Sequence, residues 1–191
     1  LPAILCIQEA VRARTERLAA VLNETKHTFY VPRLKETVTD TRATRFEIVA
    51  FNVSKVEGIA MIADTNRVGM AIDLTPPTAE KGCMDVAGRA YQIVFFPAIG
   101  SLIVNLHGPN PAVKSDREKI IEMSGLQSEK SIRCHASALE KWLTNTLKDV
   151  HIGAHNVQRV ILAGDFNDAM PLYEKQLFIH ESLPLQVCFS A

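Results

Sequence analysis

Arg159-Val-Ile-Leu-Ala-Gly-Asp-Phe-Asn-Asp168 is an apolar stretch that ends in acidic and amide side chains. Its apolar residues 160–163 predict a strand buried on both faces, and Gly164 permits a tight exit from that strand. Asp165 and Asn167 are two residues apart and are expected to project on the same side. Open α/β sheets carry their chemistry at the carboxyl ends of strands. Asp165 is therefore a candidate proton acceptor or metal ligand, and Asn167 a candidate donor to a phosphoryl oxygen or a water. A strand followed by an Asx-type turn is the structural alternative for this pair.

Two other apolar stretches end in a similar way. Ala3-Ile-Leu-Cys-Ile7 is followed by Gln8 and Glu9, and Ser101-Leu-Ile-Val-Asn-Leu-His107 finishes in a histidine. Each stretch predicts a strand with a titratable or coordinating group at its end. Behind the first strand, the spacing of apolar residues predicts an amphipathic helix whose apolar side consists of Val11, Leu18, Val21 and Leu22.

Three signatures in this order carry a family resemblance: Ile4-Leu-Cys-Ile-Gln-Glu9, Val104-Asn-Leu-His107 and Ile161-Leu-Ala-Gly-Asp-Phe-Asn167. Together they resemble the endonuclease/exonuclease/phosphatase superfamily, whose fold is that of deoxyribonuclease I, over residues 1 to about 171. The resemblance implies an α/β fold of the α+β type, a four-layer α/β/β/α sandwich of two mixed sheets flanked by helices. We expect one such domain over residues 1–191, without the usual first strand and last strands.

The resemblance also implies site roles. Glu9 would bind Mg²⁺ (or Mn²⁺), and His107 would contact or protonate the scissile phosphate. Asp165 and Asn167 would orient the attacking water and stabilise the transition state. Arg89 would bind substrate phosphate, although a surface charge at a strand edge is an equal alternative for this residue. We expect the side chains of Glu9, His107, Asp165 and Asn167 to converge at the carboxyl ends of their strands. Because hard carboxylate oxygens supply this site, Zn²⁺ is expected to have no structural role.

Two departures from the family pattern leave two functions open. An Asn that family members carry on an earlier strand is absent, and no Ser-Asp-His signature follows Asn167, where the one histidine is His180 in Ile179-His-Glu-Ser182. The chain is therefore expected to be either a fragment or a degenerate copy of the fold. The first prediction is a metal-dependent phosphodiester hydrolase, a nuclease ahead of a phosphoinositide phosphatase, a sphingomyelinase-like lipase or a deadenylase. The competing prediction is a catalytically inactive module with a structural or interaction role in a larger assembly.

The composition and net charge of the chain limit how it could bind a nucleic acid or a membrane. With 47% hydrophobic and 22% charged residues, the chain has the balance of an ordinary soluble globular domain. Because 21 basic residues match 21 acidic ones, a nucleic acid or other phosphodiester substrate would need a local basic patch. Arg12, Arg14 and Arg17 are candidates, although the interleaved Glu16 favours a solvated helix face. No apolar run is long enough to span a membrane. The four cysteines show no paired spacing, which favours an intracellular location (cytoplasm, nucleus, organelle or virion interior) over secretion.

The remaining segments predict further elements. Strands are expected at 29–31, 46–51, 58–62 and 68–72, and these four would make up much of the first sheet. A further strand is expected at 90–96, directly after Arg89. Residues 74–88 are expected to form a loop, and 115–123 and 131–147 to form helices, with Trp142 in the core and 114–130 as an insertion. His151 and His155 are four residues apart, but Gly153 between them favours a loop over a metal site.

Overall fold

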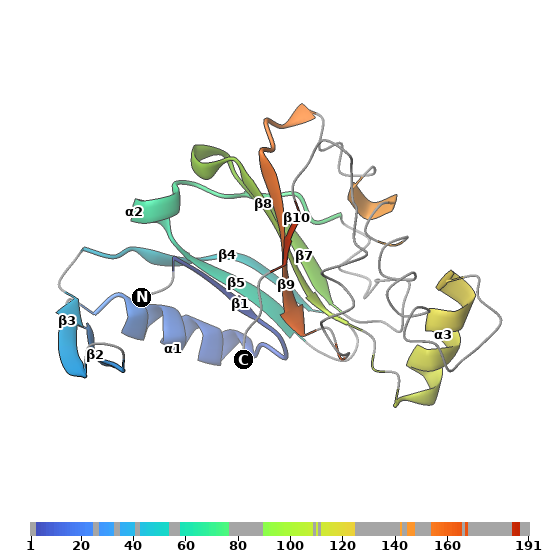
Figure 1. Cartoon of the computed structure of the whole chain (residues 1–191), viewed down its shortest axis with the longest axis horizontal. Coiled ribbons are helices and arrows are strands. Elements are labelled where there is room, and N and C mark those ends of the chain that lie inside the picture. Colours follow the sequence, from blue (N-terminus) through green and yellow to red (C-terminus); the bar gives the residue numbers. More distant parts are fainter. Residues whose placement is uncertain are drawn as a thin grey trace.

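The computed structural model describes residues 3–24, 27–32, 35–40, 43–53, 58–76, 90–108, 110, 112–124, 142, 145–147, 154–165, 167 and 185–187. Arg89, His151 and His180 lie outside these residues, as do most of the expected loop at 74–88 and most of the expected helix at 131–147. The described part is a mixed α/β fold with two main sheets and few helices (Figure 1).

The first sheet has three antiparallel strands in the order β1-β5-β4, formed by Ile4–Ile7, Gly58–Asp64 and Phe46–Val53. Helix α1 (Arg12–Leu22) packs on one face of this sheet, where Ala19 and Leu22 contact Phe46 and Ile62. At the end of α1, the Asn23 side chain accepts a hydrogen bond from Phe46 N (2.6 Å) and donates one to Phe46 O (2.8 Å). The helix is therefore fixed to the sheet by apolar burial and by these two hydrogen bonds of the Asn23 amide, which we call the amide clamp.

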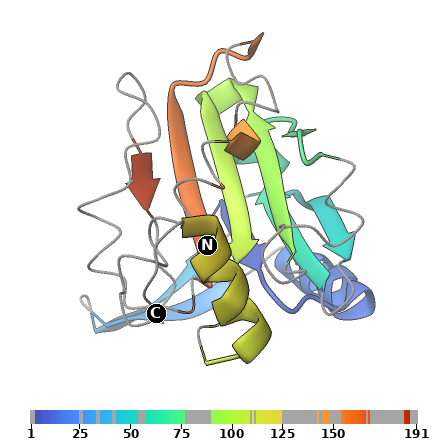
Figure 2. The ribbon, with the colours of Figure 1, turned by 90° about the vertical axis from the view of Figure 1, so that its right-hand side faces the viewer.

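The second sheet has five strands in the order β10-β9-β8-β7-β6, formed by Leu185–Val187, Arg159–Asp165, Ser101–His107, Tyr91–Phe96 and Ile72–Asp73. Strands β10, β9 and β8 are parallel, whereas β8, β7 and β6 are antiparallel. Figure 2 shows β9, β8 and β7 beside one another. The sheet is therefore mixed. Because β8 and β9 are parallel, their carboxyl ends lie side by side at the same end of the sheet.

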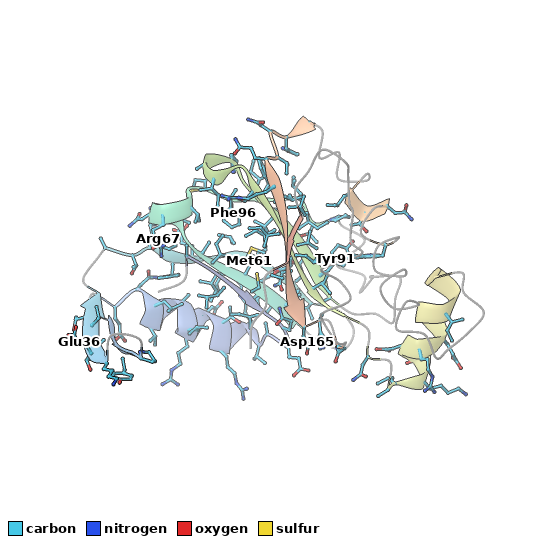
Figure 3. All side chains as sticks on the ribbon, viewed as in Figure 1. Glu36, Met61, Arg67, Tyr91, Phe96 and Asp165 are labelled. Carbon is cyan, nitrogen blue, oxygen red and sulfur yellow. The ribbon has the colours of Figure 1, made fainter. Side chains whose placement is uncertain are left out.

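The two sheets pack face to face around an apolar interior. Met61 and Ala63 from the first sheet contact Val94, Phe96 and Ile103 from the second, all of them nearly or fully buried. Met61 and Phe96 are labelled in Figure 3. Ile161 of β9 packs against the same cluster. Side chains alternate along a strand, so the residues next to these in β7, β8 and β9 face the opposite side of the second sheet.

That opposite side is also covered. Ile93, Leu102 and Leu162 are 0% exposed although they face away from the first sheet. Trp142 lies edge-on to Tyr91 with ring centroids 5.0 Å apart, and is 6% exposed. The prediction that Trp142 is a core residue is confirmed.

Three short elements and one hairpin complete the described chain. Helix α3 (Lys114–Ser124) confirms the helix expected at 115–123 and lies on the far side of the molecule from the two-stranded hairpin of β2 (His27–Val31) and β3 (Glu36–Asp40) (Figure 1). The other two are α2 (Thr65–Val68) and a 3₁₀ turn, η2 (Pro97–Ile99). Within the described residues, no helix is long and apolar enough to cross a membrane.

Two strand predictions were wrong in their placement. Residues 29–31 form a strand, but β2 pairs only with β3 and belongs to neither main sheet. The expected strand at 68–72 is interrupted because Gly69 adopts φ +76°, so Val68 ends α2 and only Ile72–Asp73 pairs, in the second sheet. Apolar periodicity does not specify which edge a short strand will join.

The predicted apolar side of α1 was also partly wrong. Val11, Leu18 and Val21 are 51%, 39% and 46% exposed. The helix buries Thr15, Ala19 and Leu22. Thr15 and Ala19 have small side chains, which let the helix backbone approach the sheet closely. The Thr15 hydroxyl is satisfied locally by donating to Val11 O (3.0 Å).

Candidate functional site

The parallel strands β8 and β9 end in register, with His107 directly opposite Asp165. Gly164 makes this close pairing possible. A Cβ atom at this position would lie 1.9 Å from Leu106 O, and the backbone has φ +135°, a conformation that side chains with a Cβ rarely adopt. The glycine before Asp165 is therefore required by the approach of the two strand ends.

His107 and Asp165 face one another across the strand ends. His107 Nε2 lies 4.0 Å from Asp165 Oδ2, and their side chains are 6% and 56% exposed. A separation of 4.0 Å is longer than a direct hydrogen bond. The arrangement places an enclosed imidazole beside a carboxylate that solvent can reach.

Asn167 is anchored across the two strands. Its backbone N donates to Asp165 Oδ1 (2.9 Å), and its Nδ2 donates to Gly108 O (2.8 Å). Gly108 N in turn donates to Asp165 O (2.6 Å). The Asx turn considered from the sequence is therefore present, and one amide hydrogen of Asn167 is already used in fixing the end of β8.

Glu9 is exposed and has φ +51°, an unusual backbone conformation for this residue type. Both of its neighbours are fixed. Gln8 Nε2 donates to Asn105 Oδ1 on β8 (2.6 Å), and Ala10 N donates to Gly58 O on β5 (2.7 Å). Gly58 is required there because a Cβ atom would lie 2.2 Å from Ala10 O. The end of β1 is thus held beside the end of β8, which brings the Glu9 backbone to the same edge as His107.

The structure therefore brings His107, Asp165 and Asn167 together and places Glu9 at the end of the strand beside them. Asp165 is labelled in Figure 3 at the end of β9. Arg89 lies outside the described residues, so its predicted phosphate contact is untested. Among the residues that are described, no three His, Cys, Asp or Glu side chains are grouped closely enough to hold a metal ion.

Sequence reasoning missed the amide side chains that support this edge. Asn105 lies inside the signature Val104-Asn-Leu-His107, but its polarity within an apolar strand received no role. It is 0% exposed and makes hydrogen bonds to Ala60 of the first sheet and to Gln92 of the second. A buried amide in the middle of an apolar strand is itself a signal, because such a group must be hydrogen-bonded.

The basic residues of α1 are only partly available for a phosphate backbone. Arg12 Nε contacts Glu16 Oε1 at 2.8 Å, and its guanidinium lies 5.0 Å from the centre of the Phe51 ring. Arg14 and Arg17 are exposed. The solvated helix face considered from the sequence fits Arg12 better than a phosphate-binding role.

Comparisons of the chain with protein-family models, with curated proteins and with solved structures find no match. The resemblance carried by the three signatures therefore remains a prediction.

Proposed function

We propose that this chain is a metal-dependent phosphodiester hydrolase, most similar in function to a nuclease, built on the four-layer sandwich of the endonuclease/exonuclease/phosphatase superfamily. The observation that carries the proposal is the register of β8 and β9. It sets His107 and Asp165 opposite one another, 4.0 Å apart, and Asn167 is anchored to Gly108 beside them.

The available ligands fit a hydrated Mg²⁺ better than a metal ion that is coordinated entirely by protein side chains. Glu9 is exposed and Asp165 is 56% exposed, so hydrated carboxylates are available at this edge. Mg²⁺ keeps several waters and binds through one or two carboxylates together with substrate phosphate oxygens. Glu9 would hold the ion, which when bound would neutralise charge that develops on the phosphate.

The protein groups have separate roles in this proposal. Asp165 Oδ1 is occupied by the Asn167 backbone, which leaves Oδ2 to accept a proton from an attacking water. His107 presents Nε2 toward the same position and can donate to a phosphate oxygen. Asn167 fixes both strand ends, so the donor and acceptor groups are held before substrate arrives, which is the arrangement that favours electrostatic stabilisation of a transition state.

Backbone strain supports a functional role for the same edge. Among the described residues, three that are not glycine have positive φ: Glu9, Asn167 and Lys35. Two of them lie at the candidate site. Conformations of this kind cost about 1–3 kcal/mol and are common at functional sites. Asn tolerates the left-handed region well, so Glu9 is the more informative of the two.

One observation favours the second function, a non-catalytic module of the same fold. Asp165 and Asn167 both make local hydrogen bonds that would stabilise a turn without any chemistry. In such a module Asp165 would be a turn residue, and its loss would lower stability by about 1 kcal/mol with no change in activity.

The test compares Asp165→Asn with Asp73→Asn. Asp73 is a matched control because its Oδ1 also accepts a hydrogen bond from the backbone two residues ahead, at Thr75 N (2.9 Å). Asparagine keeps the acceptor oxygen in both turns, so we expect both variants to melt close to the parent. Hydrolysis is measured with Mg²⁺ on plasmid DNA, an RNA oligonucleotide, a phosphoinositide and sphingomyelin.

Because no Ser-Asp-His signature follows Asn167, we expect hydrolysis of DNA or RNA by the parent to be very slow or absent. Any Mg²⁺-dependent hydrolysis should fall at least about 100-fold in Asp165→Asn and be unchanged in Asp73→Asn. The substrate cleaved by the parent identifies the substrate class. Absence of hydrolysis on all four substrates, with equal Mg²⁺ heats for the parent and Glu9→Gln in calorimetry, would establish the non-catalytic module instead.

A further inference from the structure

Four amide side chains form a continuous hydrogen-bonded chain between the two sheets. Gln8 Nε2 donates to Asn105 Oδ1 (2.6 Å), Asn105 Nδ2 donates to Gln92 Oε1 (3.1 Å), and Gln92 Nε2 donates to Asn52 Oδ1 (2.8 Å). Asn105 and Gln92 are 0% exposed. The chain links the end of β1 to β8, β7 and β4, which belong to both sheets.

Backbone carbonyls fix the donor-to-acceptor direction of this series of four amides. Asn105 Nδ2 also donates to Ala60 O (3.0 Å), and Gln92 Nε2 also donates to Ile59 O (3.1 Å). A carbonyl oxygen can only accept, so each of these two amides must turn its nitrogen toward β5. Asn105 must therefore present its oxygen to Gln8, and all four amide hydrogens of the two buried side chains are used.

A fully satisfied polar chain inside an apolar interior is rigid, because shifting one member leaves others buried without a partner. The chain is interior at Gln92 and Asn105 and reaches the sheet edge at Gln8. Gln8 is bonded directly to Glu9, and Asn105 lies two residues before His107. These hydrogen-bonded amides therefore reach the ends of β1 and β8, next to the candidate site.

We propose that Gln8 and Asn105 are positioning residues, which hold the strained backbone of Glu9 in register with His107. This inference rests on the proposed function for its significance to catalysis, but its geometric content can be measured without activity. The Gln8 side chain fixes Glu9 from one side, and the bond from Ala10 N to Gly58 O fixes it from the other. Substitution of residues that orient a metal ligand commonly lowers metal affinity or activity 10–100-fold.

The test is Gln8→Met, which keeps an unbranched side chain of similar length and removes the donor. Gln8→Asn is a second variant, since it keeps an amide but is one methylene too short to reach Asn105. Ser101→Ala is the matched control. Ser101 Oγ accepts from Arg159 Nε (2.6 Å) at the opposite end of β8, so this variant also removes one bond between strands.

Two readouts are used on the full chain. The first is amide hydrogen exchange at Ala10 and Gly108, whose N–H groups donate to Gly58 O and Asp165 O. The second is broadening of the Glu9 and Gly108 amide signals by Mn²⁺. We expect both Gln8 variants to exchange at least about tenfold faster at Ala10, unchanged at Gly108, and to need at least about tenfold more Mn²⁺ for equal broadening. Ser101→Ala is expected to match the parent in both.

Unchanged exchange at Ala10 in both Gln8 variants would overturn the inference, as would equal Mn²⁺ titrations of these variants and the parent. A loss in Ser101→Ala as large as that in Gln8→Met would overturn it too, because the effect would then follow overall stability. If the parent shows no Mn²⁺ broadening, the proposed metal-dependent function fails separately. Exchange at Ala10 then still decides whether Gln8 holds the Glu9 backbone.

Discussion

Replacement of Glu9 by glycine should make the protein more stable while removing the proposed ligand for Mg²⁺. Glu9 has φ +51° and an exposed side chain with both neighbours fixed by hydrogen bonds. The left-handed conformation costs a residue with a Cβ atom about 1–2 kcal/mol, and glycine does not incur this cost.

The expected gain is the difference between one favourable contribution and two unfavourable ones. Relief of the left-handed strain contributes about 1–2 kcal/mol, and the greater freedom of glycine in the unfolded chain removes about 0.5–1 kcal/mol of it. Glu9 also precedes the N-terminus of α1, where loss of its negative charge would cost about 0.3 kcal/mol. We therefore expect Glu9→Gly to raise the free energy of unfolding by about 0.5 kcal/mol.

Urea denaturation followed by fluorescence of Trp142, the one tryptophan of the chain, measures this free energy by linear extrapolation. Lys35→Gly is the control, because Lys35 has φ +53° in the turn between β2 and β3, away from the site. Both glycine variants should gain stability. Glu9→Gln keeps the Cβ atom and the strain and loses only the charge, so it should lie within about 0.3 kcal/mol of the parent in stability. Glu9→Gly and Glu9→Gln should both lose the Mg²⁺ heat in calorimetry.

A fall of about 1 kcal/mol or more in Glu9→Gly, with the expected gain in Lys35→Gly, would refute the reasoning. It would show that the Glu9 side chain stabilises the fold, and the strained backbone could then no longer be taken as support for a functional residue.

Three further outcomes are expected. Gly164→Ala should lower the free energy of unfolding by more than about 3 kcal/mol or prevent folding, seen as a lost or strongly lowered thermal transition, because the added Cβ would lie 1.9 Å from Leu106 O. Asn23→Ala should cost about 1–3 kcal/mol in urea denaturation, since it leaves both backbone groups of Phe46 without the amide clamp. Trp142 is 6% exposed against Tyr91, so its emission should be blue-shifted and poorly quenched by acrylamide until the chain unfolds.

The strand ends could be predicted from the sequence because each combines an apolar run with one polar residue at its carboxyl end. This pattern correctly placed His107 and Asp165 at the carboxyl ends of two strands, which the structure pairs in register. It could not decide between an Asx turn and a chemical role for Asp165 and Asn167, because local hydrogen bonds and chemistry require the same side chains.

Other features depend on contacts that no local pattern contains. The buried face of α1 could not be predicted from apolar spacing, because close packing against the sheet selected Thr15 and Ala19 over Leu18. The partners of Asn105 come from β1, β5 and β7, and only the assembled sandwich brings them together. The left-handed backbone at Glu9 likewise results from anchors on either side and has no signal in the residue itself.

The hydrogen bond between Gln8 and Asn105 joins residues 97 positions apart, and that between Asn167 and Gly108 joins residues 59 apart. Closing such long loops costs chain entropy before any contact repays it, and topologies rich in distant pairings fold slowly. The edge that carries Glu9, His107 and Asp165 can therefore form only after β1 has docked onto strands made much later in synthesis. Refolding kinetics at this edge should lag behind those of the locally paired β2 and β3, and a growing chain would acquire any activity only once β9 is complete.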